Sequence, residues 1–210
     1  MTTEQIDALV KNSMAKFKVA GFSVGVVKDG KIIYEKGFGV KSINTKAPVD
    51  EHTNFAIASN SKAFTTVALA LLVEEGKLKW TDKVKDHIPE FKMYNDYVTE
   101  NFNIQDLLTH RSGMGLGVGD LMFFPDGSNF TVKDVVTSFQ HFKPVSAFRT
   151  KFDYDNLLYI VAGEVVARAS GMSYEAFVQK RIIEPLQMNR TFVGNLRKDK
   201  SNLAVPHSSE

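Results

Sequence analysis

The N-terminal segment has the hydrophobic spacing of an amphipathic helix. Its apolar side chains recur every three or four positions, at Ile6, Leu9, Val10, Met14 and Phe17. Thr2 and Gln5 have the spacing of a capping box, in which each side chain binds the backbone N–H of the other residue. The sequence therefore predicts a helix over residues 3–18 that is ended by Gly21.

The hydrophobic pattern then becomes that of strands. Residues 22–27 and 31–35 are rich in β-branched and aromatic side chains, and Asp29 and Gly30 lie between the two runs. An Asp-Gly pair tolerates the left-handed backbone that a two-residue hairpin turn requires. The chain is therefore expected to begin with a helix followed by a β-hairpin.

Helical spacing returns at residue 59 and dominates the remainder of the chain. The first long helix is predicted over residues 59–75, and Gly76 is its stop signal. Its expected buried face consists of Phe64, Val67, Ala68, Leu71 and Leu72. A second long helix should run from about residue 156 to Gly171. Shorter helices are predicted near residues 104–109 and 131–141 and from Ser173 to Pro185.

The predicted sheet is incomplete within this sequence. A two-stranded hairpin is marginally stable alone, so further strands are needed. After residue 58 the one weak candidate is the stretch 191–194, and residues 196–210 are polar and typical of a loop. Unpaired strand edges invite pairing, so self-association or pairing with another chain through this open edge is expected.

Composition excludes several classes of function. The 210 residues are 43% hydrophobic and 24% charged, which is enough for a buried core. The net charge is only +2 and no basic block occurs, so nucleic acid is not expected as a partner. The absence of cysteine excludes disulfides, thiolate metal sites and a cysteine nucleophile. No apolar stretch reaches transmembrane length, and the N-terminus has no signal-peptide features.

The first candidate for chemistry is Ser59 with Lys62. A serine at the start of a helix and a lysine three residues later lie on one face, and the helix N-terminus adds partial positive charge there. A neutral lysine amine can accept the serine proton and so activate the nucleophile. The same spacing occurs at Ser13 and Lys16, inside the first helix, where we interpret it as a solvated face. Position alone leaves Ser59 either as a nucleophile or as a helix N-cap.

The second candidate is the pair of Tyr154 and Asn156. Tyr154 lies 95 residues after Ser59. A phenol near a lysine can act as general base and then as general acid. An asparagine side chain can bind both a lysine and a substrate amide. The alternative is a turn that caps the next helix. A third motif, Lys-Thr-Gly or His-x-Gly on a strand, is absent, because His207 is followed by serine.

Four segments in this order resemble the serine beta-lactamase and penicillin-binding protein superfamily, in its class C and esterase-like branch, over residues 20 to about 195. They are Ser59-Asn60-Ser61-Lys62, Leu107-Leu108-Thr109-His110-Arg111-Ser112-Gly113, Tyr154-Asp155-Asn156 and Glu184-Pro185-Leu186-Gln187-Met188. Their common order favours Ser59 as the family nucleophile over a simple N-cap.

The resemblance implies an α+β, beta-lactamase/transpeptidase-like fold, in which an antiparallel sheet is flanked by helices and carries a large helical region. A single domain over residues 1–210 is expected. Residues 1–58 would supply the N-terminal helix and first strands, and residues 59–195 the helical region with the active-site motifs. Residues 196–210 would form a polar tail. The last strands, with the missing motif, would lie beyond Glu210.

The resemblance also implies a serine hydrolase without metal or cofactor, acting on a small-molecule or peptide-like substrate. Ser59 would attack an ester, amide or beta-lactam carbonyl while Lys62 and Tyr154 move the proton and Asn156 orients the substrate. We favour an esterase or a D-amino-acid peptidase in a periplasmic or secreted location. The alternative is a non-catalytic fragment or binding module that retains the scaffold.

Two residues near the motifs carry further expectations. Asp155 replaces the usual small residue between the tyrosine and the asparagine. Its charge is expected to raise the pKa of Tyr154 and to disfavour acidic substrates. His110 is expected to be a structural hydrogen-bonding residue. The loop from Gly113 to Gly119 either shapes a pocket or simply forms a surface turn.

Overall fold

The computed structural model describes residues 1–124, 127–194 and 202–207. The backbone contacts divide the chain into two units, Met1–Ala58 with Asn189–Glu210 and Ser59–Met188. The predicted boundary at residues 58 and 59 is therefore also a boundary between units, and the single domain over residues 1–210 stays a prediction. No helix in the described ranges is long and apolar enough to cross a membrane.

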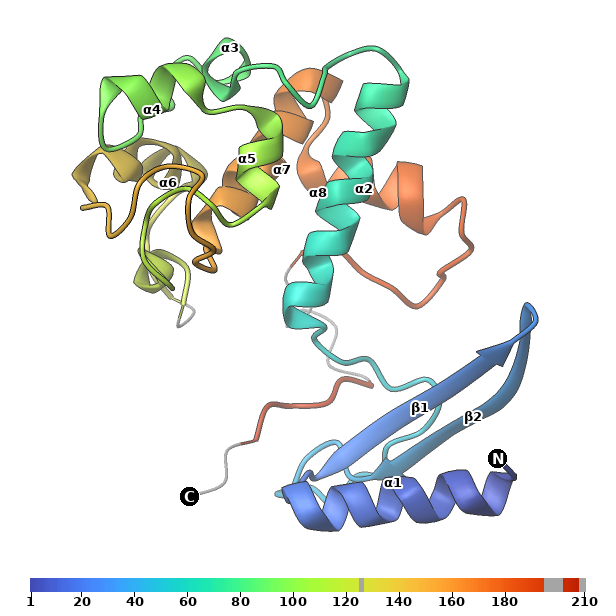
Figure 1. Ribbon diagram of the computed structural model, residues 1–210. Coiled ribbons are helices and arrows are strands. Elements are labelled where there is room, and N and C mark those ends of the chain that lie inside the picture. Colours follow the sequence, from blue (N-terminus) through green and yellow to red (C-terminus); the bar gives the residue numbers. More distant parts are fainter. Residues whose placement is uncertain (125–126, 195–201, 208–210) are drawn as a thin grey trace. The chain divides into compact units, whose positions relative to one another are not determined.

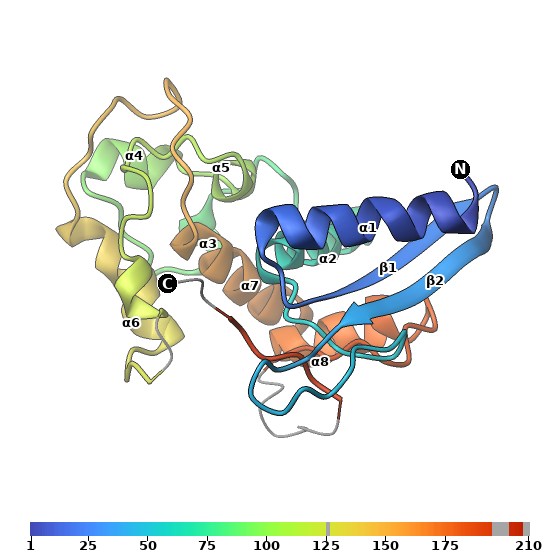
Figure 2. The same cartoon turned by 90° about the horizontal axis from the view of Figure 1, so that it is seen from below.

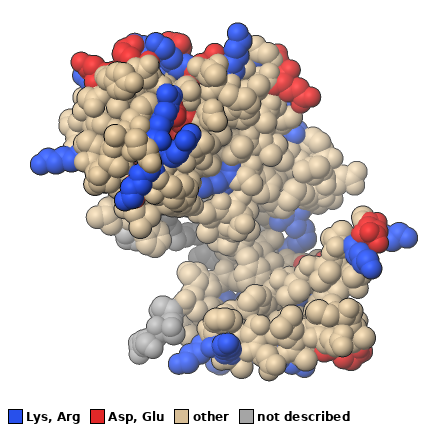
Figure 3. Space-filling view, viewed as in Figure 1, with Lys and Arg blue, Asp and Glu red and all other residues tan. Residues whose placement is uncertain are grey.

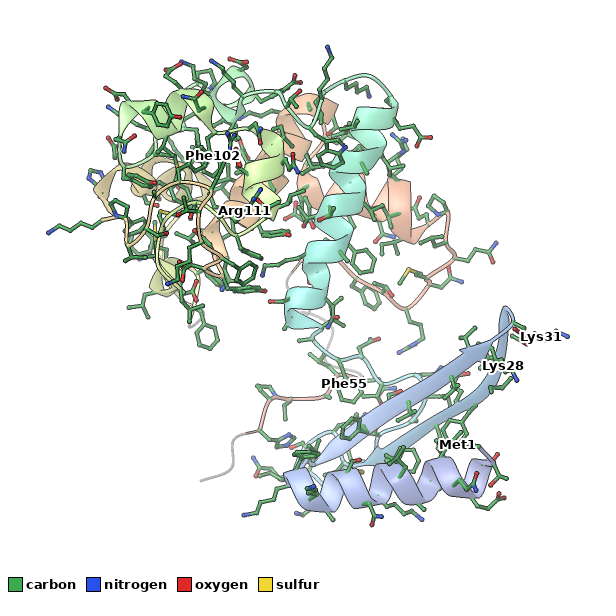
Figure 4. The ribbon with its side chains drawn as sticks, viewed as in Figure 1. Met1, Lys28, Lys31, Phe55, Phe102 and Arg111 are labelled. Atoms are coloured by element: carbon green, nitrogen blue, oxygen red, sulfur yellow. The ribbon has the colours of Figure 1, made fainter. Side chains whose placement is uncertain are left out.

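The first unit contains the predicted helix and hairpin, α1 (Thr3–Phe17), β1 (Gly21–Lys28) and β2 (Lys31–Gly39). The capping box forms as expected at the start of α1. Asp29 and Gly30 both have positive φ, 51° and 72°, as a two-residue hairpin turn requires. Figure 4 marks the two ends of this turn with Lys28 and Lys31.

The helix α1 lies along the hairpin in both ribbon views (Figures 1 and 2). Its buried residues Ile6 and Val10 form a small core with Tyr34 and Phe38 of β2. The Tyr34 hydroxyl also donates to the Asp7 carboxylate at 2.5 Å. Apolar contact and the hydrogen bonds from Tyr34 and Lys36 to Asp7 thus hold the helix against the hairpin.

The stretch 191–194, the one weak candidate for a later strand, does not form a strand. Across the described residues the sheet has the two antiparallel strands β1 and β2, and residues 191–194 form no ladder with either. An extended run becomes a strand only where a neighbouring segment pairs with its backbone. Leu203 makes a single parallel bridge with Asn54. Residues 195–201 and 208–210 of the predicted polar tail lie outside the described residues.

The second unit is built from helices around α7 (Leu157–Ser170), which ends at Gly171 in the left-handed conformation as predicted. The longest neighbour is α2 (Ser61–Glu74). The shorter elements are α3 (Val84–His87), α4 (Asp96–Asn101), α5 (Ile104–Leu108), η2 (Asp120–Met122), α6 (Val132–Ser138), η3 (Phe139–His141), α8 (Tyr174–Val178) and the π-helical η4 (Gln179–Ile183). A 3-10 turn, η1 (Ala58–Asn60), precedes α2.

The core of the second unit surrounds α7 on several sides. The helices α2, α3, α5, α6 and α8 all pack against it, and Figure 1 shows it among these neighbours. Its buried positions exceed a single stripe and include adjacent residues such as Leu157 with Leu158 and Val165 with Val166. A helix that is apolar on most faces is one that lies in the interior, which makes α7 a firm support for the residues at its first turn.

The predicted buried face of the helix over residues 59–75 is partly wrong. The stripe that packs in this unit is Thr65, Ala68, Leu69 and Leu72, whereas Val67 is 45% exposed. Thr65 belongs to the packed stripe because its hydroxyl has a partner, the Tyr174 hydroxyl at 2.7 Å. A polar side chain that is hydrogen-bonded can be buried at little cost, and hydrophobicity alone does not reveal this.

Charged side chains of both signs are scattered over the surface that Figure 3 presents, and most of that surface is uncharged. This distribution agrees with the small net charge of +2.

Candidate active site

The side chains of Ser59 and Lys62 meet at the start of α2. Lys62 Nζ donates to Ser59 Oγ at 3.1 Å. Ser59 lies in the turn before the helix, and the N-cap position is held by Asn60, whose side chain makes no capping hydrogen bond. Ala58, just before the serine, has φ 45°, a conformation that a residue with a β-carbon adopts at a cost. Strained backbone beside an exposed serine is typical of a functional site.

The amide of Asn156 connects the lysine to a carboxylate that the sequence did not reveal. Lys62 Nζ donates to Asn156 Oδ1 at 2.7 Å. Asn156 Nδ2 donates to both oxygens of Asp120, each at 3.1 Å. Lysine only donates and a carboxylate only accepts, so the two neighbours fix the orientation of the amide. Ser59, Lys62, Asn156 and Asp120 thus form one continuous chain of hydrogen bonds.

Tyr154 lies beside the same lysine. Lys62 Nζ is 4.7 Å from the centre of the Tyr154 ring and 5.2 Å from that of Tyr159. Hydrogen bonds from Lys62 and then Ser59 lower the pKa of the Tyr154 hydroxyl, and partial burial and then the charge of Asp120 oppose them. A lowered pKa is what a tyrosine needs in order to act as a general base near neutral pH. The structure therefore brings together all four predicted site residues.

The imidazole ring of His110 lies against the ring of Tyr154 and supports it. The two rings are stacked, with centroids 4.3 Å apart and an interplanar angle of 27°. His110 Nδ1 accepts the backbone N–H of Asp155 at 3.1 Å, so its proton belongs on Nε2. Burial, and then the charge of Lys62, lowers the pKa of His110. These contacts fit the expected structural role, in which a neutral imidazole holds Tyr154 in place.

The expectation that Asp155 raises the pKa of Tyr154 is wrong. The Asp155 side chain points into the interior and is fully buried, with Oδ1 accepting the backbone N–H of Leu158 at 3.3 Å. The pKa of Tyr154 is lowered, and the carboxylate that acts against this is Asp120. Sequence adjacency did not predict which side of the turn the Asp155 carboxylate would face.

Asp155 has a consequence for stability instead. Burial raises the pKa of its carboxyl to about 7, and Oδ2 has no hydrogen-bond partner. A carboxyl whose pKa is higher in the folded protein than in the unfolded chain binds protons on folding. Its contribution to stability is therefore complete at low pH and is lost as pH rises from about 4 to about 7.

We accordingly expect Asp155→Asn to stabilise the protein above pH 7 and to have little effect near pH 4. The gain in the free energy of unfolding at pH 8 relative to pH 4.5 should be about 3 kcal/mol. Urea unfolding at pH 4.5 and pH 8 measures it, with the exposed Glu184→Gln as a control for the charge change. An equal pH dependence of stability in Asp155→Asn and in the unmodified protein would contradict the buried carboxyl as its source.

The loop before Asp120 explains how that carboxylate reaches the site. The backbone N–H of Gly117 donates to the Tyr154 carbonyl at 3.0 Å. Gly119 has φ 76°, and a β-carbon there would overlap the Leu157 side chain. Of the two interpretations left open for the Gly113–Gly119 loop, the structure favours the one in which it shapes the site. The glycine-rich composition was the available sequence signal, but it did not single out Asp120.

No metal site accompanies these residues. Within residues 1–124, 127–194 and 202–207, no three histidine, aspartate or glutamate side chains are grouped so that they could hold a metal ion. The polar groups of the site are instead used by one another, as the hydrogen bonds of Lys62 and Asn156 show.

Comparison with known proteins places these features in a family context. The family model described as Beta-lactamase matches residues 6–209. Protein flp of Staphylococcus aureus (strain MW2) is 31% identical over 192 residues, which are 90% of this chain and 38% of that protein. Unguisins hydrolase ungD' of Aspergillus campestris is 30% identical over 191 residues, which are 88% of this chain and 35% of that protein. The chain thus spans less than half the length of these relatives.

Solved structures agree with the fold expected from the sequence motifs. The octameric penicillin-binding protein homologue from Pyrococcus abyssi superposes with a TM-score of 0.81 at 29% identity, covering 97% of this chain and 47% of that one. A class C beta-lactamase superposes with a TM-score of 0.79 at 25% identity, covering 96% of this chain and 53% of that one. The fold is beta-lactamase/transpeptidase-like, and this chain represents about half of it.

Proposed function

Because the chain belongs to the beta-lactamase family, we propose that it is a serine hydrolase that forms an acyl-enzyme through Ser59. The observation that carries the proposal is the contact of 3.1 Å between Lys62 Nζ and Ser59 Oγ at the start of α2. The substrate is an ester, amide or lactam with an accessible carbonyl group. The Aspergillus relative is named a hydrolase, which supports hydrolytic chemistry.

The first step is acylation. Ser59 Oγ attacks the carbonyl carbon while the serine proton passes to the Tyr154 oxygen or the Lys62 amine. The carbon–leaving-group bond then breaks, and the departing oxygen or nitrogen takes that proton. The Tyr154 oxygen is suited to both transfers because hydrogen bonds from Lys62 and Ser59 lower its pKa. A water molecule then attacks the acyl-enzyme by the reverse sequence of proton transfers and releases the acid.

The negative charge that develops on the carbonyl oxygen requires hydrogen-bond donors. The backbone N–H of Ser59, close to the N-terminus of α2, is one such donor. Family resemblance assigns the second to a strand that follows the helical region, and the described residues contribute the two strands β1 and β2. A complete oxyanion hole therefore depends on the rest of the family fold.

The two-stranded sheet of the described residues favours a second candidate function. A chain that spans less than half of its relatives, and whose described residues contain the strands β1 and β2, can retain the scaffold as a binding module without turnover. The two functions differ in deacylation. A hydrolase releases product repeatedly, whereas a binding module either does not react or stays covalently modified.

Mapping a covalent adduct tests the proposal directly. A fluorophosphonate should transfer its phosphonyl group to the serine oxygen with loss of fluoride, and peptide mass spectrometry of the protein as its gene encodes it should locate the adduct on Ser59. The unlabelled reference is Ser13, which has the same spacing to a lysine inside α1. Labelling of Ser13, of both serines equally, or of neither would contradict the proposal.

A further inference from the structure

The carboxylate of Asp120 is a charged group at the site that the chemistry of acyl transfer does not require. It is half-buried at the start of η2, and both of its oxygens accept from Asn156 Nδ2. Its charge opposes the lowering of the pKa of Tyr154 and adds to burial in raising the pKa of Asp155, so it acts on the groups around Ser59. Asp120 therefore belongs to the electrostatic environment in which a substrate must bind.

The loop holds Asp120 in this place. The backbone N–H of Asp120 donates to the Gly117 carbonyl at 3.2 Å, and the backbone N–H of Gly117 donates to the Tyr154 carbonyl at 3.0 Å. The close approach of Gly119 to Leu157 and Phe142 leaves no space for a side chain. These contacts fix the backbone of Asp120, and the two hydrogen bonds from Asn156 Nδ2 hold its carboxylate at the site.

Asp120 also lacks a cationic partner. In the part of the chain that the structure describes, no lysine, arginine or histidine side chain lies within ion-pairing distance of it, although many other carboxylates have such a partner. Among the described residues, the donor to its carboxylate is the neutral amide of Asn156. A carboxylate has about four acceptor positions, so Asp120 retains capacity for a further donor.

We infer that Asp120 selects substrates that carry a positively charged amino group close to the scissile carbonyl. An ammonium donating to a carboxylate forms a charge-assisted hydrogen bond, which is stronger than a neutral one. A substrate carboxylate in the same place would be repelled. This inference rests on the proposed acyl-enzyme function of Ser59, and it narrows the substrates of that site to amine-bearing esters or amides, such as those of amino acids.

A matched set of three p-nitrophenyl esters tests the inference. The β-alanyl, butyryl and succinyl esters share the leaving group and present an ammonium, a methyl group and a carboxylate at equivalent positions. For the protein as its gene encodes it, we expect kcat/KM for the β-alanyl ester to exceed that for the butyryl ester by about tenfold. The succinyl ester should be the poorest of the three.

The variant Asp120→Asn keeps the size of the side chain and an acceptor oxygen for Asn156 but removes the charge. It should bring the three kcat/KM values to within about threefold of one another, because neither the attraction of the ammonium nor the repulsion of the carboxylate remains. The exposed Glu184→Gln makes the same charge change elsewhere in the unit and should keep the preference of the unmodified protein.

The outcomes separate the two proposals. If Asp120→Asn lowers all three rates by one common factor, Asp120 only positions Asn156 and the inference is wrong. If the unmodified protein shows no preference for the β-alanyl ester but is labelled at Ser59, the inference fails while the proposed function stands. If it hydrolyses none of the esters and Ser59 is not labelled, the proposed function fails, and the inference fails with it.

Discussion

Replacement of Ser59 by alanine is expected to lower kcat/KM for a chromogenic ester by at least about 10³-fold. The hydroxyl of Ser59 is the aliphatic one that Lys62 Nζ contacts in the described site, at 3.1 Å. Removal of the nucleophile in hydrolases that act through an acyl-enzyme leaves only the rate that binding and oxyanion stabilisation provide. Initial rates with p-nitrophenyl butyrate measure the effect.

The chain offers a matched control for this substitution. Ser13 precedes Lys16 by three residues, as Ser59 precedes Lys62, but it lies within α1 and no hydrogen bond joins it to Lys16 among the described contacts. Ser13→Ala should keep the full rate. Ser59→Ala should keep its free energy of unfolding within about 0.5 kcal/mol, because the side chain is exposed. A folded Ser59→Ala variant with an unchanged rate would show that another group reacts with the ester.

The local patterns of the sequence predicted those elements whose signals are local. The capping box at Thr2 and the Asp29-Gly30 turn depend on neighbouring residues, and the structure has both. The long helix that ends at Gly171 follows from its apolar run and its stop signal. Val67 was assigned to a buried face because of its hydrophobicity, whereas burial in α2 depends on which stripe meets α7 and α8.

The site shows the same limit of sequence reasoning. Ser59, Lys62, Tyr154 and Asn156 were found because they belong to short motifs with a recognisable order. Asp120 was missed because it contacts Asn156 across 36 residues through a glycine-rich loop, and no local pattern encodes that contact. The Asp155 carboxylate was assigned to the wrong side of its turn, since adjacency in sequence does not determine the direction of a side chain.

Replacement of Lys62 by methionine is expected to lower kcat/KM for the same ester by about 10³-fold. Lys62 contacts Ser59 Oγ and Asn156 Oδ1 and lies over the rings of Tyr154 and Tyr159. Methionine keeps the unbranched stem that packs against these rings but has no amine to donate or accept a proton. The matched substitution Lys16→Met, in α1, should leave the rate unchanged.

The pH dependence of the residual activity distinguishes loss of the amine from a general loss of structure. The hydrogen bond from Lys62 is the largest cause of the lowered pKa of Tyr154, so this pKa should rise in Lys62→Met. If Tyr154 acts as a base, the ascending limb of the pH–rate profile should then move to higher pH. Tyr154→Phe keeps the ring that stacks on His110 and should abolish that limb. A Lys62→Met variant that is as slow as expected but has an unshifted profile would exclude Tyr154 as the base that Lys62 tunes.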